Sequence, residues 1–266
     1  MELTTRYGDR LMPEILTVDI KELRRKKIMK DTLFSPVLVE KLSEALGKGE
    51  QAILFQNRRG FAPVIECKDC GWVPHCVNCD VSLTYHKFRN ELVCHYCGYK
   101  IQLPHQCPEC QSPELRTMGF GTEMVEEEIA TLFPSAKVER LDFDTARTRT
   151  AYERIIADFE KGKTQILIGT QMLSKGLDFG NVSVVGILNA DSLMNFPDFR
   201  AHERAFQLMV QVSGRSGRRD KRGTVVLQTS APDHPLIRMV ERFAIRRWCV
   251  FNWASGVCFV IRLTTV

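Results

Sequence analysis

The sequence lacks the long apolar runs that place a protein in a membrane and the apolar leader that directs export. No stretch approaches the roughly 18 uninterrupted apolar residues that suggest a membrane-spanning helix. The segment MELTTRYGDRLMPE at the start of the sequence is charged and has no apolar centre, unlike an export signal. We therefore expect a cytoplasmic protein with no membrane contact.

The excess of positive over negative charge is also small. A formal net charge of +5 does not by itself identify a nucleic-acid-binding protein. The basic residues nevertheless cluster at 21–30 (KELRRKKIMK), 57–60 (NRRG) and 214–223 (GRSGRRDKRG). We interpret the first cluster as a solvated helix face and the last as a functional segment. The 266 residues are enough for one large domain or two small ones.

A phosphate loop of the form G-x-x-x-x-G-K-[ST] is missing as well. The nearest match, EKGKTQILIGT at 160–170, has Ala157 where the first glycine is required. Gly162 there follows a helical pattern and precedes a buried-strand run, which is the reverse of the order that a phosphate loop needs. We interpret Gly162 as the glycine that ends a helix. LDFD at 141–144 is interpreted as a strand-end turn rather than a magnesium-binding motif.

Cysteine, in contrast, is abundant. Ten cysteines without an export signal make a disulfide framework unexpected. Eight of them form four C-x-x-C pairs, and two such pairs complete a tetrahedral zinc site of four thiolates with no position open for water. We therefore predict two structural Zn²⁺ ions. The predicted ligands are Cys67, Cys70, Cys76, Cys79, Cys94, Cys97, Cys107 and Cys110.

The pairing of the four C-x-x-C units is nested or sequential. A hairpin-length segment, DVSLTYHKFRNELV, separates Cys79 from Cys94, which is close to zinc-ribbon spacing. That spacing favours joining the two inner pairs and leaves the first pair with the last. An inserted module must enter and leave its host at neighbouring points, and the nested pairing satisfies this. The histidines nearby are expected at the surface or behind the ligands: His75, His86, His95 and His105.

Outside the cysteine block, helix-like and strand-like segments alternate. Helices are expected at 35–50, 122–133, 149–162 and 202–217, and strands at 51–57, 136–142, 164–170, 182–190 and 223–229. This alternation predicts an α/β fold with a parallel sheet covered by helices on both faces. The cysteine block interrupts the pattern after its first strand and is interpreted as an insertion.

Two stretches carry residues suited to nucleotide and nucleic-acid chemistry. QVSGRSGRR at 211–219 ends the last helix with Arg215 and Arg218 three apart, a spacing that puts both guanidiniums on one helical face, where they can clamp a phosphate. ILIGTQMLSKGLDF at 166–179 places Thr170 at a strand end, where it can bind a nucleic-acid phosphate. Asp178, in the loop that follows, can reach a nucleotide sugar.

These stretches resemble the second RecA-like lobe of superfamily 2 helicases. ILFQNRRGFAP (53–63) is similar to motif IV, GTQMLSKGLDF (169–179) to motif V and QVSGRSGR (211–218) to motif VI. The cysteine pairs that interrupt the lobe after motif IV narrow the resemblance, over residues 10–240, to the bacterial primosomal replication-restart helicases. The resemblance implies an ATP-dependent 3′→5′ DNA helicase that acts at stalled forks.

The resemblance also implies partners, cofactors and residue roles. The partners are forked and single-stranded DNA, primosome proteins and single-stranded DNA-binding protein, in a nucleoid-associated bacterial cytoplasmic protein. ATP and Mg²⁺ would be bound mainly by a first lobe that this sequence does not contain, so we expect the isolated chain to be inactive. The implied site residues are Arg215 and Arg218 for catalysis, Gly176, Asp178 and Gln211 for the nucleotide, and Thr170, Asn57, Arg58 and Arg59 for DNA.

We expect an inter-lobe segment at 1–30, the helicase C-terminal lobe at 31–66 and 119–235, and the zinc insertion at 67–118. Residues 236–266 match nothing expected of the family, and the sequence leaves open whether they are divergent or non-native; Cys249 and Cys258 lie there and are expected to be unrelated to the metal sites. The alternative is a zinc-dependent docking module for DNA or protein on an α/β scaffold without a motor role. A zinc-ribbon nuclease or transcription accessory protein would need an acidic or histidine triad, which we do not find.

Overall fold

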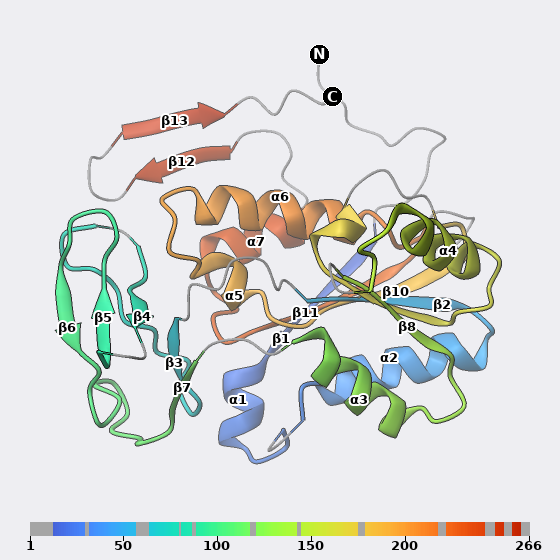
Figure 1. Cartoon of the computed structure of the whole chain (residues 1–266), viewed down its shortest axis with the longest axis horizontal. Coiled ribbons are helices and arrows are strands. Elements are labelled where there is room, and N and C mark those ends of the chain that lie inside the picture. Colours follow the sequence, from blue (N-terminus) through green and yellow to red (C-terminus); the bar gives the residue numbers. More distant parts are fainter. Residues whose placement is uncertain are drawn as a thin grey trace.

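A parallel sheet forms the centre of the protein in the computed structural model (Figure 1). The structure describes residues 13–29, 32–56, 64–79, 81–86, 89–117, 121–142, 145–174, 179–217, 222–242, 248–252 and 257–261. Six strands pair in the order β1-β11-β10-β2-β9-β8, and every neighbouring pair is parallel. The strands are β1 (Glu14–Asp19), β2 (Gln51–Phe55), β8 (Val138–Leu141), β9 (Ile166–Gly169), β10 (Val182–Ile187) and β11 (Thr224–Thr229).

Helices cover both faces of this sheet, which confirms the predicted α/β fold class. One face carries α1 (Ile20–Arg25), α2 (Pro36–Gly47) and α3 (Thr122–Leu132). The other carries α4 (Arg149–Glu160), α5 (Asp191–Met194), α6 (Ala201–Ser213), α7 (Pro235–Glu241) and the short 3-10 helix η1 (Gln171–Ser174). The helix beginning at Pro36 is capped by Ser35, whose hydroxyl accepts the N–H of Leu38 at 3.3 Å.

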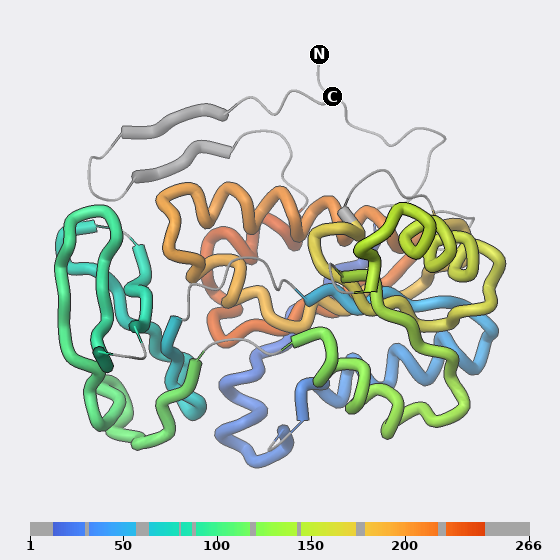
Figure 2. The backbone as a smooth tube through the Cα atoms, in the orientation of Figure 1, coloured from blue at the N-terminus to red at the C-terminus, as the bar shows by residue number. Residues whose placement is uncertain are grey.

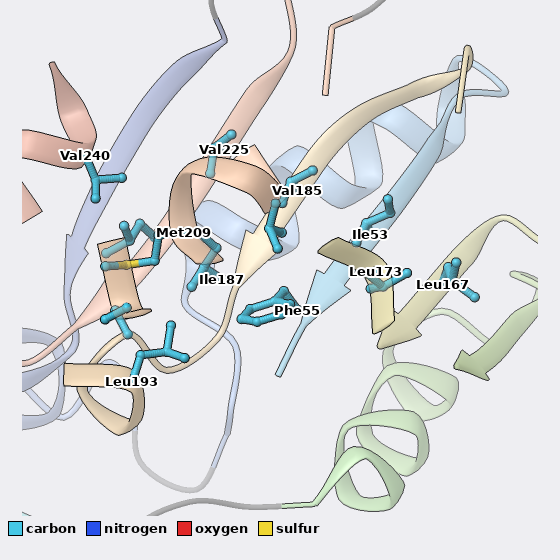
Figure 3. Close-up of a cluster of buried hydrophobic side chains, with 14 of the residues drawn as sticks. Ile53, Phe55, Leu167, Leu173, Val185, Ile187, Leu193, Met209, Val225 and Val240 are labelled. Carbon is cyan, nitrogen blue, oxygen red and sulfur yellow. The ribbon is translucent and has the colours of Figure 1, made fainter. Parts of the chain in front are cut away.

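The two faces bury separate apolar clusters because successive side chains of a strand point to opposite sides. In β2, Ile53 and Phe55 pack with α4 and α6, whereas Ala52 and Leu54 pack with α2 and α3. Figure 3 shows the first of these clusters, in which Phe55 and Ile187 lie beside one another from neighbouring strands. Buried runs without polar alternation are typical of parallel strands covered on both sides.

The cysteine block forms a separate module at one end of the sheet (Figure 2). Strands β3 (Ile65–Cys67) and β7 (Leu115–Thr117), where the chain enters and leaves the module, pair antiparallel. Beyond them, β4 (Thr84–His86), β5 (Glu91–Val93) and β6 (Lys100–Gln102) make a three-stranded antiparallel sheet with its own apolar cluster. The module is therefore an insertion, and its two ends are joined as expected.

Some elements differ from the expectation or were not predicted. Strand β1 lies in the segment expected between lobes, yet it forms the edge of the main sheet, pairing with β11. Helix α7 falls partly in the expected tail and packs onto the main core. Two further strands, β12 (Trp248–Asn252) and β13 (Val257–Ile261), form an antiparallel hairpin. Among the described residues, no helix is long and apolar enough to cross a membrane.

The Gly-Lys-Thr segment at 162–164 is a helix terminus and not a phosphate loop. Gly162 has φ of +73° directly after α4 and its N–H donates to the carbonyl of Phe159 at 3.0 Å. Lys163 pairs with Asp158 at 3.0 Å, and the hydroxyl of Thr164 donates to Glu139 at 2.9 Å. All three residues therefore serve the connection from α4 to β9.

Candidate functional site

Eight cysteine sulfurs gather in two groups of four within the module. The outer group joins the first and last C-x-x-C pairs, and the inner group joins the two middle pairs, which is the nested arrangement. Within each group all the sulfurs lie within 4.8 Å of one another. The outer group is Cys67, Cys70, Cys107 and Cys110, and the inner group is Cys76, Cys79, Cys94 and Cys97.

The sulfur positions fit a tetrahedral zinc ion. Zinc–sulfur bonds of about 2.3 Å place neighbouring sulfurs of a tetrahedron about 3.8 Å apart. Cys67 and Cys110 are separated by 3.6 Å, Cys70 and Cys107 by 3.5 Å, and Cys76 and Cys97 by 3.4 Å between their Sγ atoms. A disulfide would require about 2.05 Å. The donor set therefore fits two Zn²⁺ ions, each enclosed by four thiolates.

The backbone shapes each C-x-x-C unit as a tight turn around its sulfurs. The N–H of Gly71 donates to the carbonyl of Cys67, and the N–H of Gly98 to that of Cys94, both at 2.9 Å. These glycines follow the second cysteine of their pair and have φ of +75° and +76°. Gln111 occupies the corresponding position after Cys110 with φ of +61°, a conformation that a residue with a Cβ adopts at a cost.

Crowding of four thiols gives the members of a group different pKa values. In the inner group, the backbone N–H of Tyr99 and a neighbouring thiol lower the pKa of Cys97 to about 6. Partial burial and the surrounding sulfurs raise the pKa of Cys79 to about 12. In the outer group, burial raises the pKa of Cys67 and of Cys70. A divalent cation that replaces the shared protons lets all four sulfurs ionise, as structural zinc requires.

The base of the module packs directly on the carboxyl-terminal edge of the main sheet. Gly71 lies so close to the loop after β11 that a Cβ on it would approach the Cβ of Ser230 to 2.8 Å. The N–H of Ser230 donates to buried Asp191 at 2.7 Å, and burial raises the pKa of this carboxyl. Glu66 accepts two hydrogen bonds from Arg116 at 2.9 and 2.7 Å. The Glu66–Arg116 pair joins β3 to β7 within the module, and the close approach of Gly71 to Ser230 holds the outer cysteine group against the lobe.

Arg215 lies beyond α6 and not on it, so the expectation of two arginines on one helical face is wrong for this residue. The helix ends at Ser213, and Gly214 caps it. Arg215 follows in a turn, 8% exposed, with its N–H donating to the carbonyl of Val212 at 2.9 Å. Gly214 breaks the helix because glycine costs more conformational entropy there than any other residue. Arg218 lies outside the described residues.

The loop that carries Arg215 is pinned to the amino-terminal edge of the sheet. The N–H of Gly217 donates to the carbonyl of Val182, the first residue of β10, at 3.1 Å. Gly223, just before β11, lies against this turn, where a Cβ would approach the Gly217 nitrogen to 2.4 Å. The position of Arg215 is therefore fixed by backbone contacts on both sides. Gln211, in the last turn of α6, is exposed on the helix that leads into it.

Thr170 lies at the opposite edge of the sheet. It follows β9 directly, is buried, and its carbonyl accepts the N–H of Leu173 in the first turn of η1 at 3.0 Å. Gln56, the last described residue before the predicted DNA-binding residues Asn57, Arg58 and Arg59, donates its N–H to the carbonyl of Gly169 at 3.0 Å. The carboxyl ends of β2 and β9 therefore adjoin. The structure separates this edge from the turn that carries Arg215.

Six predicted site residues lie outside the described residues: Asn57, Arg58, Arg59, Gly176, Asp178 and Arg218. The sequence also missed the contact that Tyr96 of the module makes with Phe199 of the lobe. The Tyr96 hydroxyl accepts the N–H of Phe199 at 3.3 Å, and their rings meet edge to face with centroids 6.2 Å apart. No local pattern signals it, because the two residues are far apart in the chain.

Two family descriptions match segments of the chain. Residues 76–101 match the PriA DNA helicase Cys-rich region (CRR) domain, and residues 116–220 match the helicase conserved C-terminal domain. The first segment contains the inner cysteine group. The second contains β8 to β10, α6 and the turn that carries Arg215.

Two relatives that match most of the chain carry the same name. The replication restart protein PriA of Bacillus subtilis (strain 168) is 48% identical over 241 residues, which are 91% of this chain and 30% of that protein. The protein of the same name from Haemophilus influenzae is 46% identical over 235 residues, 88% of this chain and 32% of that protein. The chain thus spans about a third of the length of these relatives.

A solved structure, S. cerevisiae Dbp5 bound to RNA and ADP BeF3, is similar at 13% identity with a TM-score of 0.43, covering 88% of this chain and 38% of that one. So distant a likeness supports no functional statement.

Proposed function

This chain carries the helicase C-terminal domain and the cysteine-rich region of the PriA replication restart proteins. We therefore propose that it is the second motor lobe of an ATP-dependent DNA helicase. The whole enzyme would move 3′→5′ on single-stranded DNA and act at stalled replication forks. ATP and Mg²⁺ would be bound mainly by a first lobe, and this lobe would complete the site from the opposite side.

The observation that supports this proposal most directly is the fixed turn after α6. An arginine that stabilises the charge of a transferring phosphoryl group must be held in place before the reaction, because reorganisation during the reaction costs rate. Backbone contacts to Val182 and Gly223 hold the turn of Arg215 in this way. We assign Arg215 and Arg218 to the phosphates, and Gly176, Asp178 and Gln211 to the remainder of the nucleotide.

DNA would run along the carboxyl-terminal edge of the sheet. Thr170 follows β9, and Gln56 at the adjoining end of β2 is the last described residue before Asn57, Arg58 and Arg59. We assign these four residues to the phosphates of the DNA. ATP and DNA would then contact opposite edges of one rigid sheet. A change at one edge reaches the other through the packed core between them.

The zinc module would serve as a structural accessory that is not part of the ATPase site. Each ion would be held by four thiolates and so would have no coordination position for a reacting water. Zinc supplies folding energy in such a site. We place the duplex junction of the fork, and contacts with primosome proteins and single-stranded DNA-binding protein, on the side of the molecule that carries the module. The enzyme would work in the bacterial cytoplasm, at the nucleoid.

Substitution of Arg215 in the full-length enzyme tests the motor assignment. Arg215→Ala should reduce DNA-stimulated ATP turnover on the order of 10³-fold, the scale seen for such arginines, because the charge facing the transferring phosphoryl group is lost. Arg238→Ala is the matched control, since Arg238 pairs on the surface of α7 with Asp233 and Glu241. Turnover near the wild-type rate in a folded Arg215→Ala enzyme would favour the alternative, a zinc docking module on a passive α/β scaffold.

A further inference from the structure

Two exposed aromatic side chains meet where the zinc module touches the motor lobe. Among the described residues, six large apolar side chains are exposed, and Tyr96 and Phe199 are the aromatic ones, 52% and 73% exposed. Single exposed apolar side chains are ordinary in soluble proteins. Here, however, the two exposed rings contact each other across two structural units, with centroids 6.2 Å apart and planes at 84°.

Both rings are presented by rigid backbone. Tyr96 lies inside the inner C-x-x-C unit between Cys94 and Cys97, whose turn is closed by the N–H of Cys94 donating to the Tyr99 carbonyl at 2.8 Å. Phe199 lies just before α6, in a turn closed by the N–H of Ala201 donating to the Asp198 carbonyl at 2.9 Å. The Tyr96 hydroxyl accepts the Phe199 N–H, which joins the two turns. A rigid ring loses little entropy when a ligand binds.

The ring geometry and the surrounding charges indicate the ligand. In an edge-to-face pair the rings do not cover each other, and Phe199 leaves most of its surface open to a planar group. The charged neighbours are already paired: Arg204 with Asp198, and Arg200 with Glu203 at 2.8 Å. Proteins that hold single-stranded nucleic acid stack its bases on open aromatic faces and hold its phosphates in a basic groove, so the open face of Phe199 is suited to a base.

We propose that Phe199, braced by Tyr96, is a stacking site for a base of single-stranded DNA. This rests on the proposed function, and it adds a contact that none of the motor motifs supplies. The site lies beyond the carboxyl end of β10, the edge of the sheet that also carries Thr170. A single DNA strand that leaves this edge toward the zinc module, which lies at one end of the sheet (Figure 1), would pass the contact between module and lobe that Tyr96 and Phe199 make. The inner zinc ion would then fix the position of the Tyr96 brace.

The test uses the full-length protein and a single-stranded oligonucleotide with 2-aminopurine at successive positions. Phe199→Ala should weaken binding about 5- to 150-fold, the range for loss of about 1–3 kcal/mol of base stacking. It should also remove the 2-aminopurine fluorescence change at one position. Phe199→Tyr keeps the ring and should bind like wild type. Met124→Ala is the matched control, because Met124 is 53% exposed on α3 and is not placed in any site.

Salt dependence separates stacking from phosphate binding. Because no phosphate contact is removed, the slope of log affinity against log salt should be the same in Phe199→Ala and wild type. A slope smaller in magnitude by about one, unchanged affinity, or a lowered melting temperature with unchanged DNA binding would overturn the proposal, the last by showing that the ring packs against another part of the protein. If wild type itself showed neither DNA binding nor DNA-stimulated ATP turnover, the proposed function would fail instead.

Discussion

At the residue scale, two glycines with the same backbone conformation have different surroundings. Gly71 and Gly98 each follow the second cysteine of a pair, with φ of +75° and +76°. A Cβ on Gly98 would meet nothing within 4 Å, whereas a Cβ on Gly71 would approach Ser230 to 2.8 Å. The C-x-x-C-G pattern predicts the left-handed turn in both. Only the structure reveals that one of these turns, the one at Gly71, faces the α/β lobe.

Substitution of these two glycines should therefore have unequal effects. Gly98→Ala should cost about 1 kcal/mol, the price of a left-handed conformation for a residue with a Cβ. Gly71→Ala should cost more than Gly98→Ala, because the added methyl group also forces the outer cysteine group away from Ser230. Urea unfolding of the two zinc-loaded variants measures the difference. Equal free energies of unfolding would show that the contact between module and lobe contributes nothing to stability.

At the element scale, the sequence predicts well what local pattern determines. Helices α2, α3, α4 and α6 and strands β2, β8, β9, β10 and β11 all lie where periodicity and end signals indicate. Strand β1 was missed, because its six residues pair with β11 about 200 positions along the chain and have no end signal of their own. The end of α6 was placed too late, because the spacing of the arginines suits a helix that Gly214 terminates.

The nested cysteine pairing could be anticipated because an insertion must close on itself, and β3 and β7 do pair. The way the module packs on the lobe could not be anticipated, since it depends on the contacts of Gly71 with Ser230 and of Tyr96 with Phe199. Those contacts join elements without any shared sequence pattern. Fold class and metal ligands are thus accessible from sequence, whereas the mutual placement of the two units requires coordinates.

Metal removal should act on the module alone. We expect two zinc ions per chain, and chelation should abolish hydrogen-exchange protection of β4, β5 and β6, because the binding energy of structural zinc is also folding energy. The six-stranded sheet buries its own apolar clusters on both faces and should stay protected. Metal analysis that finds one ion, or equal loss of protection in β2, β9 and β10, would contradict this division.

At the scale of the whole molecule, the chain combines a parallel α/β lobe with a module tied to it at two places. The sequence contains no phosphate loop, so in the proposed enzyme the γ-phosphate and Mg²⁺ are held on another lobe. In that proposed enzyme, the lobe would contribute Arg215 from one edge of the sheet and the predicted DNA contacts from the other. The proposed ATP site would therefore be complete only when a first lobe is present.

The isolated chain should consequently hydrolyse no ATP, with or without single-stranded DNA. Addition of a separately produced first lobe of the same enzyme should give DNA-stimulated turnover that saturates with its concentration, since the two halves of the site then meet. Phosphate release followed over a concentration series of the first lobe is the measurement. Steady DNA-stimulated turnover by the pure chain would show that it holds a phosphate site that its sequence does not reveal.

In the proposed enzyme, the α/β lobe belongs to the motor and the zinc module is an accessory to it. Two variants of the full-length enzyme, Cys94→Ser and Cys67→Ser, test this division of roles. Once circular dichroism has confirmed a folded core, ATP turnover on single-stranded DNA and strand separation on a fork are measured for each variant. Cys94→Ser removes an inner ligand and should leave turnover largely intact while strand separation falls. Cys67→Ser removes a ligand of the outer group, which lies at the base of the module beside the lobe. It should lower both ATP turnover and strand separation more than Cys94→Ser does. Equal loss of turnover and strand separation in Cys94→Ser would show that the module is part of the motor.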